Sequence, residues 1–289
     1  MMQQLPILYQ IAGSFLRKTP YFRGKRHIRN LIAKHIRCKG YTTTISFDLS
    51  EKILLNLDDW IPYHIFLTGV YAIERYATEF FCNILRKGLV FLDIGANTGY
   101  YTLLAAARVG LEGQVHAFEP VSETFKRLMD NIRINNFKNV FANCCIVHDH
   151  HGEMDIFVAD KTNTGSSSLS PVMDNYSNRV ERVETITIDS YIEQKGLRDV
   201  HIVKIDVEGS ELHVLKGMMK LLNQSQLQLF IEISEKTLQS QGTSPKELFE
   251  YLQDFGFYPS KITKTGLIKI QQDKIQNEPL VLFRKVKCH

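Results

Sequence analysis

The order of apolar and polar positions predicts strands and helices that follow one another along most of the chain. Residues 89–94 form an almost uninterrupted apolar run, typical of a strand buried on both faces, and residues 100–109 then show helical spacing up to Gly110. The same pattern predicts further strands over 115–118, 140–147, 154–158, 183–188, 201–207 and 227–233. It predicts further helices over 122–132, over 210–222 and from Pro245 to Gly256.

This alternation predicts the fold class. Strands and helices joined by right-handed crossovers give an α/β fold with a doubly wound, mostly parallel sheet that helices cover on both faces. Two late strands, near Phe257 and over 280–283, are not separated by a helix and should therefore pair antiparallel. Sheets of this kind bind ligands at the carboxyl ends of their strands.

The first 88 residues follow a different pattern. Ile45, Phe47 and Leu49 alternate with polar residues and predict a hairpin, and apolar residues between positions 73 and 85 recur at helical spacing. We therefore predict an N-terminal helical and hairpin extension in front of the sheet. The predicted parts are a basic, partly helical arm over 1–40, a hairpin and helix cap over 41–88, and the main domain over 89–289.

The composition is that of a folded globular protein. Of the 289 residues, 44% are hydrophobic and 23% are charged, which excludes disordered, collagen-like and coiled-coil chains. No apolar run is long enough to predict a membrane-spanning helix, and the first residues lack the charge order of a signal peptide. The five cysteines include no Cys-x-x-Cys pair, which argues against a zinc site or a disulfide framework. We therefore expect a cytoplasmic protein with reduced thiols.

Positive charge is concentrated in the arm. Residues 1–40 hold nine Lys or Arg and no Asp or Glu, whereas the remainder holds 26 basic and 31 acidic residues. Ile28, Leu31, Ile32 and Ile36 fall close to helical spacing, which predicts an amphipathic helix. Two interpretations stay open: the helix makes a peripheral contact with an anionic membrane, or it docks on the body and leaves its cations in solvent.

A glycine turn (DIGANTG, residues 93–99) follows the first buried strand. Its glycine spacing is G-x-x-x-G, whereas a dinucleotide fingerprint requires G-x-G-x-x-G. Asp93 stands two residues before Gly95, where a carboxylate would repel a pyrophosphate but suits the ammonium group of S-adenosylmethionine (SAM). Glu119, at the end of the next strand, would accept hydrogen bonds from both ribose hydroxyls of SAM.

A second turn (KIDVEGSE, residues 204–211) places three carboxylates within six residues. Asp206 and Glu208 would face a substrate hydroxyl and act as general base, with Glu232 at the end of the neighbouring strand as a further candidate. The alternative for Glu208 and Glu211 is stabilisation of a helix N-terminus. Asp206 and Glu232 could instead share Mg²⁺, although two carboxylates are few for that ion.

No metal site is predicted elsewhere. His148, His150 and His151 stand in a polar turn without the spaced partner ligands that a closed metal site needs. Residues 162–171, rich in Ser, Thr and Gly, predict a loop, and positions 163–166 within it are expected over the mouth of the substrate site.

Five segments of the chain form a more specific signature: FLDIGANTGYYT (91–102), HAFEP (116–120), TIDSYI (187–192), VKIDVEGSELHVLKG (203–217) and FIEI (230–233). Over about residues 69–233 the sequence resembles the FkbM-like family of SAM-dependent methyltransferases. The resemblance implies a Rossmann-like SAM methyltransferase fold with a seven-stranded sheet whose last strand is antiparallel. It also implies an acidic turn of Asp206, Glu208 and Glu211, and the following cofactor-binding residues: Asp93, Gly95, Asn97, Gly99 and Glu119.

The chain departs from this family at one place. Family members often have Glu directly after a Tyr, but here the order is Tyr71-Ala72-Ile73-Glu74, so the resemblance assigns no role to Tyr71 or Glu74.

The expected function is SAM-dependent O-methylation of a hydroxyl in a sugar, glycan, glycolipid or secondary metabolite. The expected partner is then a small-molecule or glycan acceptor. One alternative is an RNA-modifying methyltransferase guided by the basic arm, but aromatic residues for base stacking are scarce beside its lysines, so we do not expect nucleic acid as a partner. Another is a catalytically silent SAM-binding module, against which the intact Asp93, Glu119, Asp206 and Glu208 argue.

Overall fold

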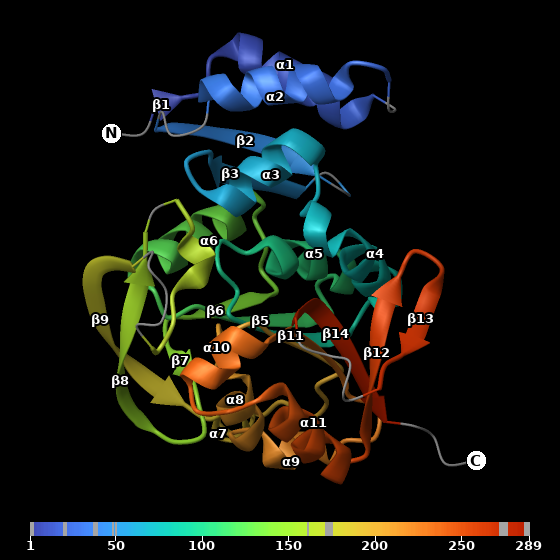
Figure 1. Cartoon of the computed structure of the whole chain (residues 1–289). Helices are drawn as coiled ribbons and strands as arrows, with labels where there is room; N and C mark the ends of the chain where they lie inside the picture. Colours follow the sequence, from blue (N-terminus) through green and yellow to red (C-terminus); the bar gives the residue numbers. More distant parts are fainter. Residues whose placement is uncertain are drawn as a thin grey trace.

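The structure is a computed structural model that describes residues 3–19, 22–36, 40–47, 49, 51–160, 162–170, 176–271 and 277–285. A large central sheet has helices on both faces, a smaller sheet lies at one side, and the N-terminal elements stack above them (Figure 1). Cys82, Cys144 and Cys145 are free thiols, while Cys38 and Cys288 lie outside the described residues, as do positions 37–39 of the predicted arm.

The central sheet has the strand order β13-β12-β14-β11-β10-β4-β5-β6. Strands β11, β10, β4, β5 and β6 run parallel, whereas β14 pairs antiparallel with both β11 and β12. The antiparallel pairing of the two late strands, β12 and β14, agrees with the prediction made from the absence of a helix between them. The doubly wound α/β fold class is thereby confirmed. The strands are β4 (Val90–Ile94), β5 (Gln114–Phe118), β6 (Val140–Asn143), β10 (Ile202–Ile205), β11 (Gln228–Ser234), β12 (Phe257–Thr263), β13 (Gly266–Lys269) and β14 (Asn277–Lys285).

The sheet has one strand more than the seven expected. β13 extends the edge as a hairpin with β12, closed by a turn in which the Thr263 hydroxyl donates to the Gly266 carbonyl at 2.8 Å. Its residues are partly or fully exposed, so the short segment carries almost no apolar pattern from which a strand would be predicted.

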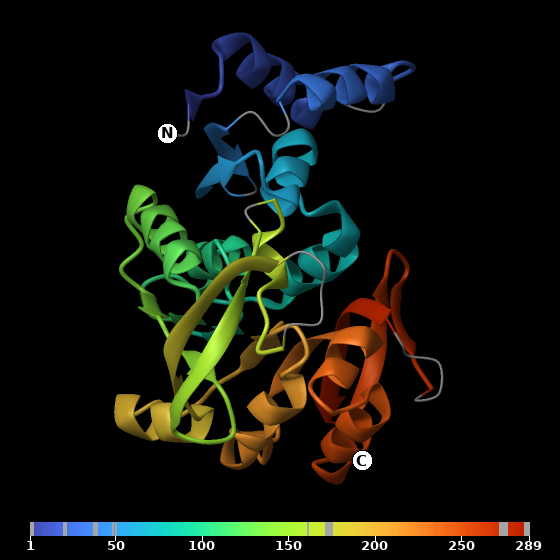
Figure 2. The same cartoon turned by 60° about the vertical axis from the view of Figure 1, so that its left-hand side comes forward.

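Helices cover the two faces of this sheet separately (Figures 1 and 2). One face carries α4 (Arg75–Ile84), α5 (Tyr100–Val109) and α6 (Ser122–Ile134). The other carries α7 (Ile188–Lys195), α8 (Glu211–Lys216), α9 (Met219–Leu222), α10 (Glu235–Ser240) and α11 (Pro245–Asp254). The predicted start of α11 is confirmed: Pro245 is at the first turn, and the Ser244 hydroxyl accepts from the Glu247 N–H at 3.2 Å.

Two predicted elements are divided in the structure. The helix expected over 210–222 breaks into α8 and α9 at Gly217, where a Cβ would lie 2.1 Å from the His148 carbonyl oxygen, so the close approach of that loop needs a glycine. The strand expected over 140–147 ends at Asn143, because β7 (Ile146–Val147) leaves the central sheet. β7 joins β8 (Gly152–Ala159) and β9 (Tyr176–Ile186) in a three-stranded sheet of order β7-β9-β8.

The N-terminal part packs on the same core as the sheet. The hairpin predicted near Phe47 is confirmed. Helix α1 lies in the arm that was predicted to be partly helical, although its range was not predicted, and α3 was not predicted. One continuous cluster of buried side chains runs from Leu16 and Ile36 through Phe66 to Phe91 and Leu282. The elements are β1 (Gln3–Gln4), α1 (Ile7–Lys18), α2 (Lys25–Ile36), β2 (Tyr41–Phe47), β3 (Glu51–Asn56), α3 (Trp60–Thr68) and the 3₁₀ turn η1 (Ala72–Glu74).

Candidate active site

A cavity of about 520 Å³ opens at the carboxyl ends of β4, β5, β10 and β11, where a sheet of this topology binds ligands. Apolar side chains line one part of it, among them Phe118, Val121, Ile146 and Ile156. Carboxylates line another part: Glu74, Glu119, Asp206, Glu208 and Glu232. The cavity can therefore hold a ligand that is flat and apolar at one end and cationic at the other.

The glycine turn after β4 forms part of the cavity wall. Gly95 (φ 80°) and Asn97 (φ 50°) both have left-handed backbone conformations, and both line the cavity. The N–H groups of Gly95 and Ala96 donate to the Phe118 carbonyl at 3.0 and 2.9 Å, which ties the turn to the end of β5. The backbone of the turn is thus held open toward the cavity.

Glu119 joins this turn to the start of α6. Its carboxylate accepts from the Asn97 N–H at 3.0 Å and the Val121 N–H at 3.0 Å. Burial raises its pKa to about 7, although the two backbone N–H groups oppose that rise. Each carboxylate oxygen keeps a lone pair, because a carboxylate accepts about four hydrogen bonds.

Two residues of the predicted cofactor set lie outside the cavity lining. Asp93 is 1% exposed, and its carboxylate accepts from the Thr102 hydroxyl in the first turn of α5 at 2.5 Å. Gly99 (φ 98°) precedes α5, and a Cβ there would lie 2.6 Å from a methyl carbon of Leu128. Both residues therefore support the conformation of the turn without lining the cavity.

The acidic turn after β10 lies against the glycine turn. Asp206 accepts from the buried Lys204 ammonium at 2.7 Å. Burial alone would raise the pKa of Asp206, but Lys204 and a hydrogen bond from Glu232 outweigh burial and hold the pKa below its usual value. Asp206 is therefore ionised at neutral pH.

The two neighbouring carboxylates have the opposite character. Burial and the charge of Asp206 raise the pKa values of Glu208 and Glu232 well above the usual range, with a further contribution from Glu211 to Glu208 and from Glu208 to Glu232. Glu208 has a left-handed backbone (φ 53°), and β11 has a register irregularity between Ile231 and Ile233 that directs Glu232 toward the cavity. Glu232 is therefore protonated at neutral pH and donates to Asp206.

Three further residues of the site were not predicted. Glu74 lines the cavity, accepts from the Tyr101 hydroxyl at 2.6 Å, and has a pKa raised to about 7 by burial. Tyr71 lines the cavity beside it. Lys204 is 3% exposed with its ammonium 5.1 Å from the centre of the Tyr101 ring. Two features of the sequence could have pointed to these residues: the unusual spacing of Tyr71 and Glu74, and the position of Lys204 near the end of a strand.

The loop after β8 and the start of α3 meet over the cavity. The Thr164 hydroxyl donates to the buried Asp59 carboxylate, and the Trp60 N–H donates to the Thr162 carbonyl at 3.1 Å. Residues 162–169 all line the cavity, so the loop expected over the substrate mouth does border it.

Glu211 stabilises the acidic turn without lining the cavity. Its carboxylate accepts from the N–H groups of Val207 and Gly209, each at 3.2 Å, and burial raises its pKa to about 7. The interpretation of Glu211 as a structural residue at the helix start agrees with these contacts.

The raised pKa of Glu211 predicts a pH-dependent stability. A carboxyl with a higher pKa in the folded state stabilises the protein below its unfolded pKa near 4.5, and this stability is lost as pH rises through about 7. Glu211→Gln should therefore be more stable than the wild type at pH 8, by about 1 to 3 kcal/mol, and nearly equal to it at pH 5. Chemical denaturation at both pH values measures the difference. The exposed Glu112→Gln serves as control, and the same pH dependence in all three proteins would contradict the assignment.

A family model, the methyltransferase FkbM domain, matches residues 93–259 and so covers more than half of the chain. The chain belongs to the FkbM methyltransferase family. The resemblance noted in the sequence is confirmed, and the chain is a methyltransferase with a Rossmann-like, SAM-binding fold.

Relatives of this FkbM methyltransferase include two proteins that are also named methyltransferases. The hexuronic acid methyltransferase AglP of Haloferax volcanii is 28% identical over 190 residues, covering 64% of this chain and 67% of that protein. Methyltransferase 1 of Beauveria bassiana is 24% identical over 176 residues, or 55% of this chain and 67% of that protein.

Solved structures resemble the fold more distantly. The methyltransferase FkbM from Methylobacillus flagellatus has a TM-score of 0.44 at 16% identity and covers 76% of this chain and 52% of that chain. An rRNA methylase from Streptococcus thermophilus has a TM-score of 0.43 at 13% identity and covers 74% of this chain and 97% of that chain.

Proposed function

We propose that this FkbM methyltransferase transfers the methyl group of SAM to a hydroxyl oxygen of a sugar or glycan. The observation that carries the proposal is the ionised Asp206 at the cavity wall, held by Lys204 and by protonated Glu232. A sugar acceptor is supported by the similarity to AglP, which methylates a hexuronic acid.

The donor set of the cavity fits SAM. The apolar part, with Phe118 and Ile146, suits the adenine ring, and Glu119 presents carboxylate lone pairs for the ribose hydroxyls. The acidic part, which includes Glu74 and Asp206, suits the ammonium and sulfonium charges. We assign Gly95 and Asn97 to the cavity wall against the cofactor, and Asp93 and Gly99 to shaping that wall.

The residues of the chain have separate roles in the proposed reaction. Bound SAM supplies an electrophilic methyl carbon. Asp206 orients the acceptor hydroxyl and takes its proton as the new O–C bond forms and the C–S bond breaks. Lys204 keeps Asp206 ionised, Glu232 orients the Asp206 carboxylate by donating its own proton to it, and Glu208 borders the acceptor side.

The proposed mechanism requires no Mg²⁺. The carboxylate oxygens of Asp206, Glu208 and Glu232 lie within 4.8 Å of one another, and hard carboxylates of this kind are ligands that Mg²⁺ accepts. Lys204 and the proton on Glu232 already compensate the charge of this group. Turnover should therefore survive dialysis against EDTA, and a loss that Mg²⁺ restores would assign these three residues to a metal instead.

The acceptor class can be tested directly. Among the described residues that line the cavity there is no Lys, Arg or His to pair with an acceptor carboxylate. We therefore expect faster methylation of a neutral glycoside than of the matching uronic acid glycoside, measured with isotopically labelled SAM and mass analysis of the product. The absence of transfer to any sugar, glycan or extract hydroxyl, with SAM bound, would favour the silent binding module. Transfer to RNA would favour the RNA-modifying alternative.

Glu119 should be essential for cofactor affinity. Glu119→Ala removes the acceptor for two backbone N–H groups and for the ribose hydroxyls, so the Kd for SAM should rise about ten- to a hundredfold. Calorimetry measures the affinity, and Glu112→Gln at the exposed surface provides the matched control. An unchanged Kd in Glu119→Ala would remove Glu119 from the cofactor site.

A further inference from the structure

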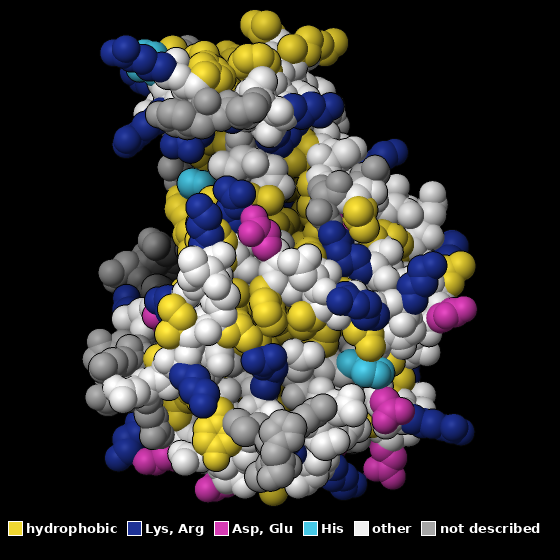
Figure 3. All heavy atoms as spheres, turned by 90° about the vertical axis from the view of Figure 1, so that its right-hand side faces the viewer, with side chains coloured by type: hydrophobic (Ala, Val, Ile, Leu, Met, Phe, Trp, Pro, Cys, Tyr) yellow, Lys and Arg dark blue, Asp and Glu magenta, His cyan; other side chains and the backbone are white. Residues whose placement is uncertain are grey.

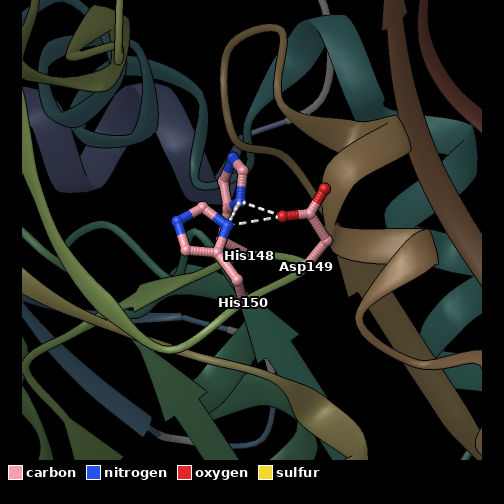
Figure 4. A group of neighbouring side chains, drawn as sticks. All are labelled: His148, Asp149 and His150. Carbon is pink, nitrogen blue, oxygen red and sulfur yellow. Dashed lines mark hydrogen bonds and ion pairs between the residues drawn. The ribbon is translucent and has the colours of Figure 1, made fainter.

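A second cluster of functional groups lies outside the active-site cavity, in the turn between β7 and β8. His148, Asp149 and His150 converge there (Figure 4). His213 reaches the same carboxylate from α8. We call these four residues the His148 cluster. His213 is more than sixty positions away in the sequence, so only the fold brings it to the polar turn, for which no further partner was visible in the sequence.

The ligand atoms of this cluster are unusually close together. The Asp149 Oδ1 atom lies 2.8 Å from the His148 Nδ1 atom and 2.6 Å from the His150 Nδ1 atom, and the two nitrogens lie 3.2 Å apart. In a tetrahedral zinc site with Zn–N distances of about 2.1 Å, neighbouring ligand atoms lie about 3.4 Å apart. A cation would therefore enter with movements of less than about 1 Å.

Hydrogen bonding alone does not satisfy this arrangement. If both Nδ1 atoms carry a proton for Asp149, two N–H groups face each other at 3.2 Å. If one Nδ1 is unprotonated, its lone pair faces a lone pair of the Asp149 oxygen. A bound cation removes the conflict, because all three atoms can then direct lone pairs toward it.

From this geometry we propose that the His148 cluster binds one first-row divalent cation of the Zn²⁺ type. His148, Asp149 and His150 are the ligands, and solvent completes the site on the exposed side of His150. His213 is a positioning residue: its Nδ1 atom lies 2.9 Å from the second Asp149 oxygen, and its ring stacks on that of His148. The cation would fasten the β7–β8 turn to α8, which follows the acidic turn of the active site.

The test uses the full chain, freed of metal, titrated with Zn²⁺ and analysed for bound metal. We expect about one Zn²⁺ per chain and a rise in the thermal midpoint on binding. His150→Ala should bind Zn²⁺ at least about tenfold more weakly. His150 is exposed, so its loss should leave the fold intact, unlike a change at buried His148.

Two further variants sharpen the result. His151→Ala, in the same turn but outside the cluster, should bind Zn²⁺ as the wild type does. His213→Gln should weaken binding about ten- to a hundredfold, as expected for an outer residue that orients a ligand. Equal Zn²⁺ affinity in the wild type and His150→Ala, or no binding at micromolar Zn²⁺, would overturn the proposal.

A separate observation, on α1 and α2, carries an independent second proposal. Six large apolar side chains on these helices are between 39% and 74% exposed: Ile7, Leu8, Ile11, Phe15, Ile28 and Leu31. We call them the N-terminal apolar face. Figure 3 shows hydrophobic side chains gathered over the top of the molecule, where these helices lie, with basic side chains beside them.

The two interpretations of the arm apply to different residues of it. Ile32 and Ile36 are buried against the body, as the docking interpretation requires, whereas Ile28 and Leu31 on the same helix are exposed. Exposed basic side chains border the face, among them Lys18, Arg23, Arg26 and Lys34, and residues 1–47 contain no acid. Among the described residues no helix is long and apolar enough to cross a membrane.

We infer that the N-terminal apolar face rests on an anionic membrane surface. Exposure of a contiguous apolar surface to water is unfavourable. Burying that surface at the boundary between headgroups and acyl chains lowers the free energy. The bordering cations add attraction to anionic lipid, and the absence of acids removes the opposing repulsion. An uncharged binding partner would gain nothing from this ring of positive charge.

Vesicle co-sedimentation of the full chain tests the inference. Binding should be strong on phosphatidylcholine vesicles containing phosphatidylglycerol, weak on phosphatidylcholine alone, and reduced by salt. The triple variant Leu8→Gln, Ile11→Gln, Phe15→Gln should lose binding. The matched control replaces the exposed Leu111, Phe141 and Ile268 with Gln and should bind normally.

A charge series completes the design. Arg23→Gln, Arg26→Gln and Lys34→Gln together should lower the partition coefficient about a hundredfold, because each cation near the surface contributes about fivefold. Lys220→Gln with Lys246→Gln is the control on the far helices. Equal sedimentation of all variants would overturn the inference, as would concentration-dependent dimerisation abolished by the apolar triple variant.

Discussion

Asp206→Asn should lower turnover by about 10²- to 10⁴-fold, which is the loss expected when a general base is removed. Asparagine keeps the shape of the side chain but cannot take the proton of the acceptor hydroxyl. Because SAM is expected to contact several other groups, including Glu119, its Kd should rise much less than turnover falls. Single-turnover assays with labelled SAM measure the chemical step, and calorimetry measures the affinity.

Glu232→Gln separates the base from its neighbour. Glu232 is protonated and donates to Asp206, and glutamine reproduces that donor, so turnover should stay within about tenfold of the wild type. If Glu232→Gln loses as much activity as Asp206→Asn, the proton acceptor is Glu232. If neither variant loses activity, the base lies outside the pair.

The Asn variant also leaves Lys204 buried without its closest anionic partner. An unpaired buried charge destabilises a protein strongly, so thermal midpoints must accompany the kinetics. Asp206→Asn combined with Lys204→Met removes both charges. If the double variant regains stability but not turnover, the kinetic loss belongs to Asp206 and not to misfolding.

The sequence predicted the central sheet well because its strands carry a strong local signal. β4, β10 and β11 are apolar almost throughout, and the late antiparallel pair follows from the absent helix. The N-terminal helices were harder to predict. α3 is apolar on nearly every side and α1 exposes half of its apolar residues, so neither shows the single buried stripe that marks a surface helix.

Those site residues that stand at the carboxyl ends of strands could be predicted from the sequence. Gly95, Asn97, Glu119, Asp206, Glu208 and Glu232 were all chosen on that basis, and all line one cavity. Whether a strand-end side chain faces the cavity or the core is a tertiary property. Asp93 turns to Thr102, whereas Glu74, from an unrelated turn, reaches the carboxylates of β10 and β11. His213 likewise joins Asp149 only through folding.

The protonation states of the site carboxylates could not be predicted from the sequence either. Asp206 and Glu232 are both carboxylic acids at neighbouring strand ends, and their order along the chain does not distinguish them. The structure does, because Lys204 lies against Asp206, while Glu232 meets only burial and negative charge. One buried lysine thus divides a group of acids into an ionised proton acceptor and a protonated donor.

Gly95→Ala should disrupt the site from its backbone. A Cβ at Gly95 would lie 1.8 Å from the Asp206 carbonyl oxygen, and the residue has φ 80°. The glycine turn and the acidic turn touch here, so an added methyl group must push apart the two elements that carry cofactor and base. Left-handed strain together with the clash should cost about 3 kcal/mol of stability or more, and SAM binding should fall below detection.

Gly88→Ala isolates the contribution of the clash. Gly88 has φ 81°, nearly the same backbone conformation, but nothing lies within 4 Å of a Cβ placed there. Its cost should therefore be the left-handed strain alone, about 1 to 2 kcal/mol, with SAM affinity unchanged. Denaturant unfolding and calorimetry on both variants measure the difference. Similar losses of stability in the two would mean that the turns separate easily, and the close contact of Gly95 with Asp206 would then not be what holds cofactor and base together.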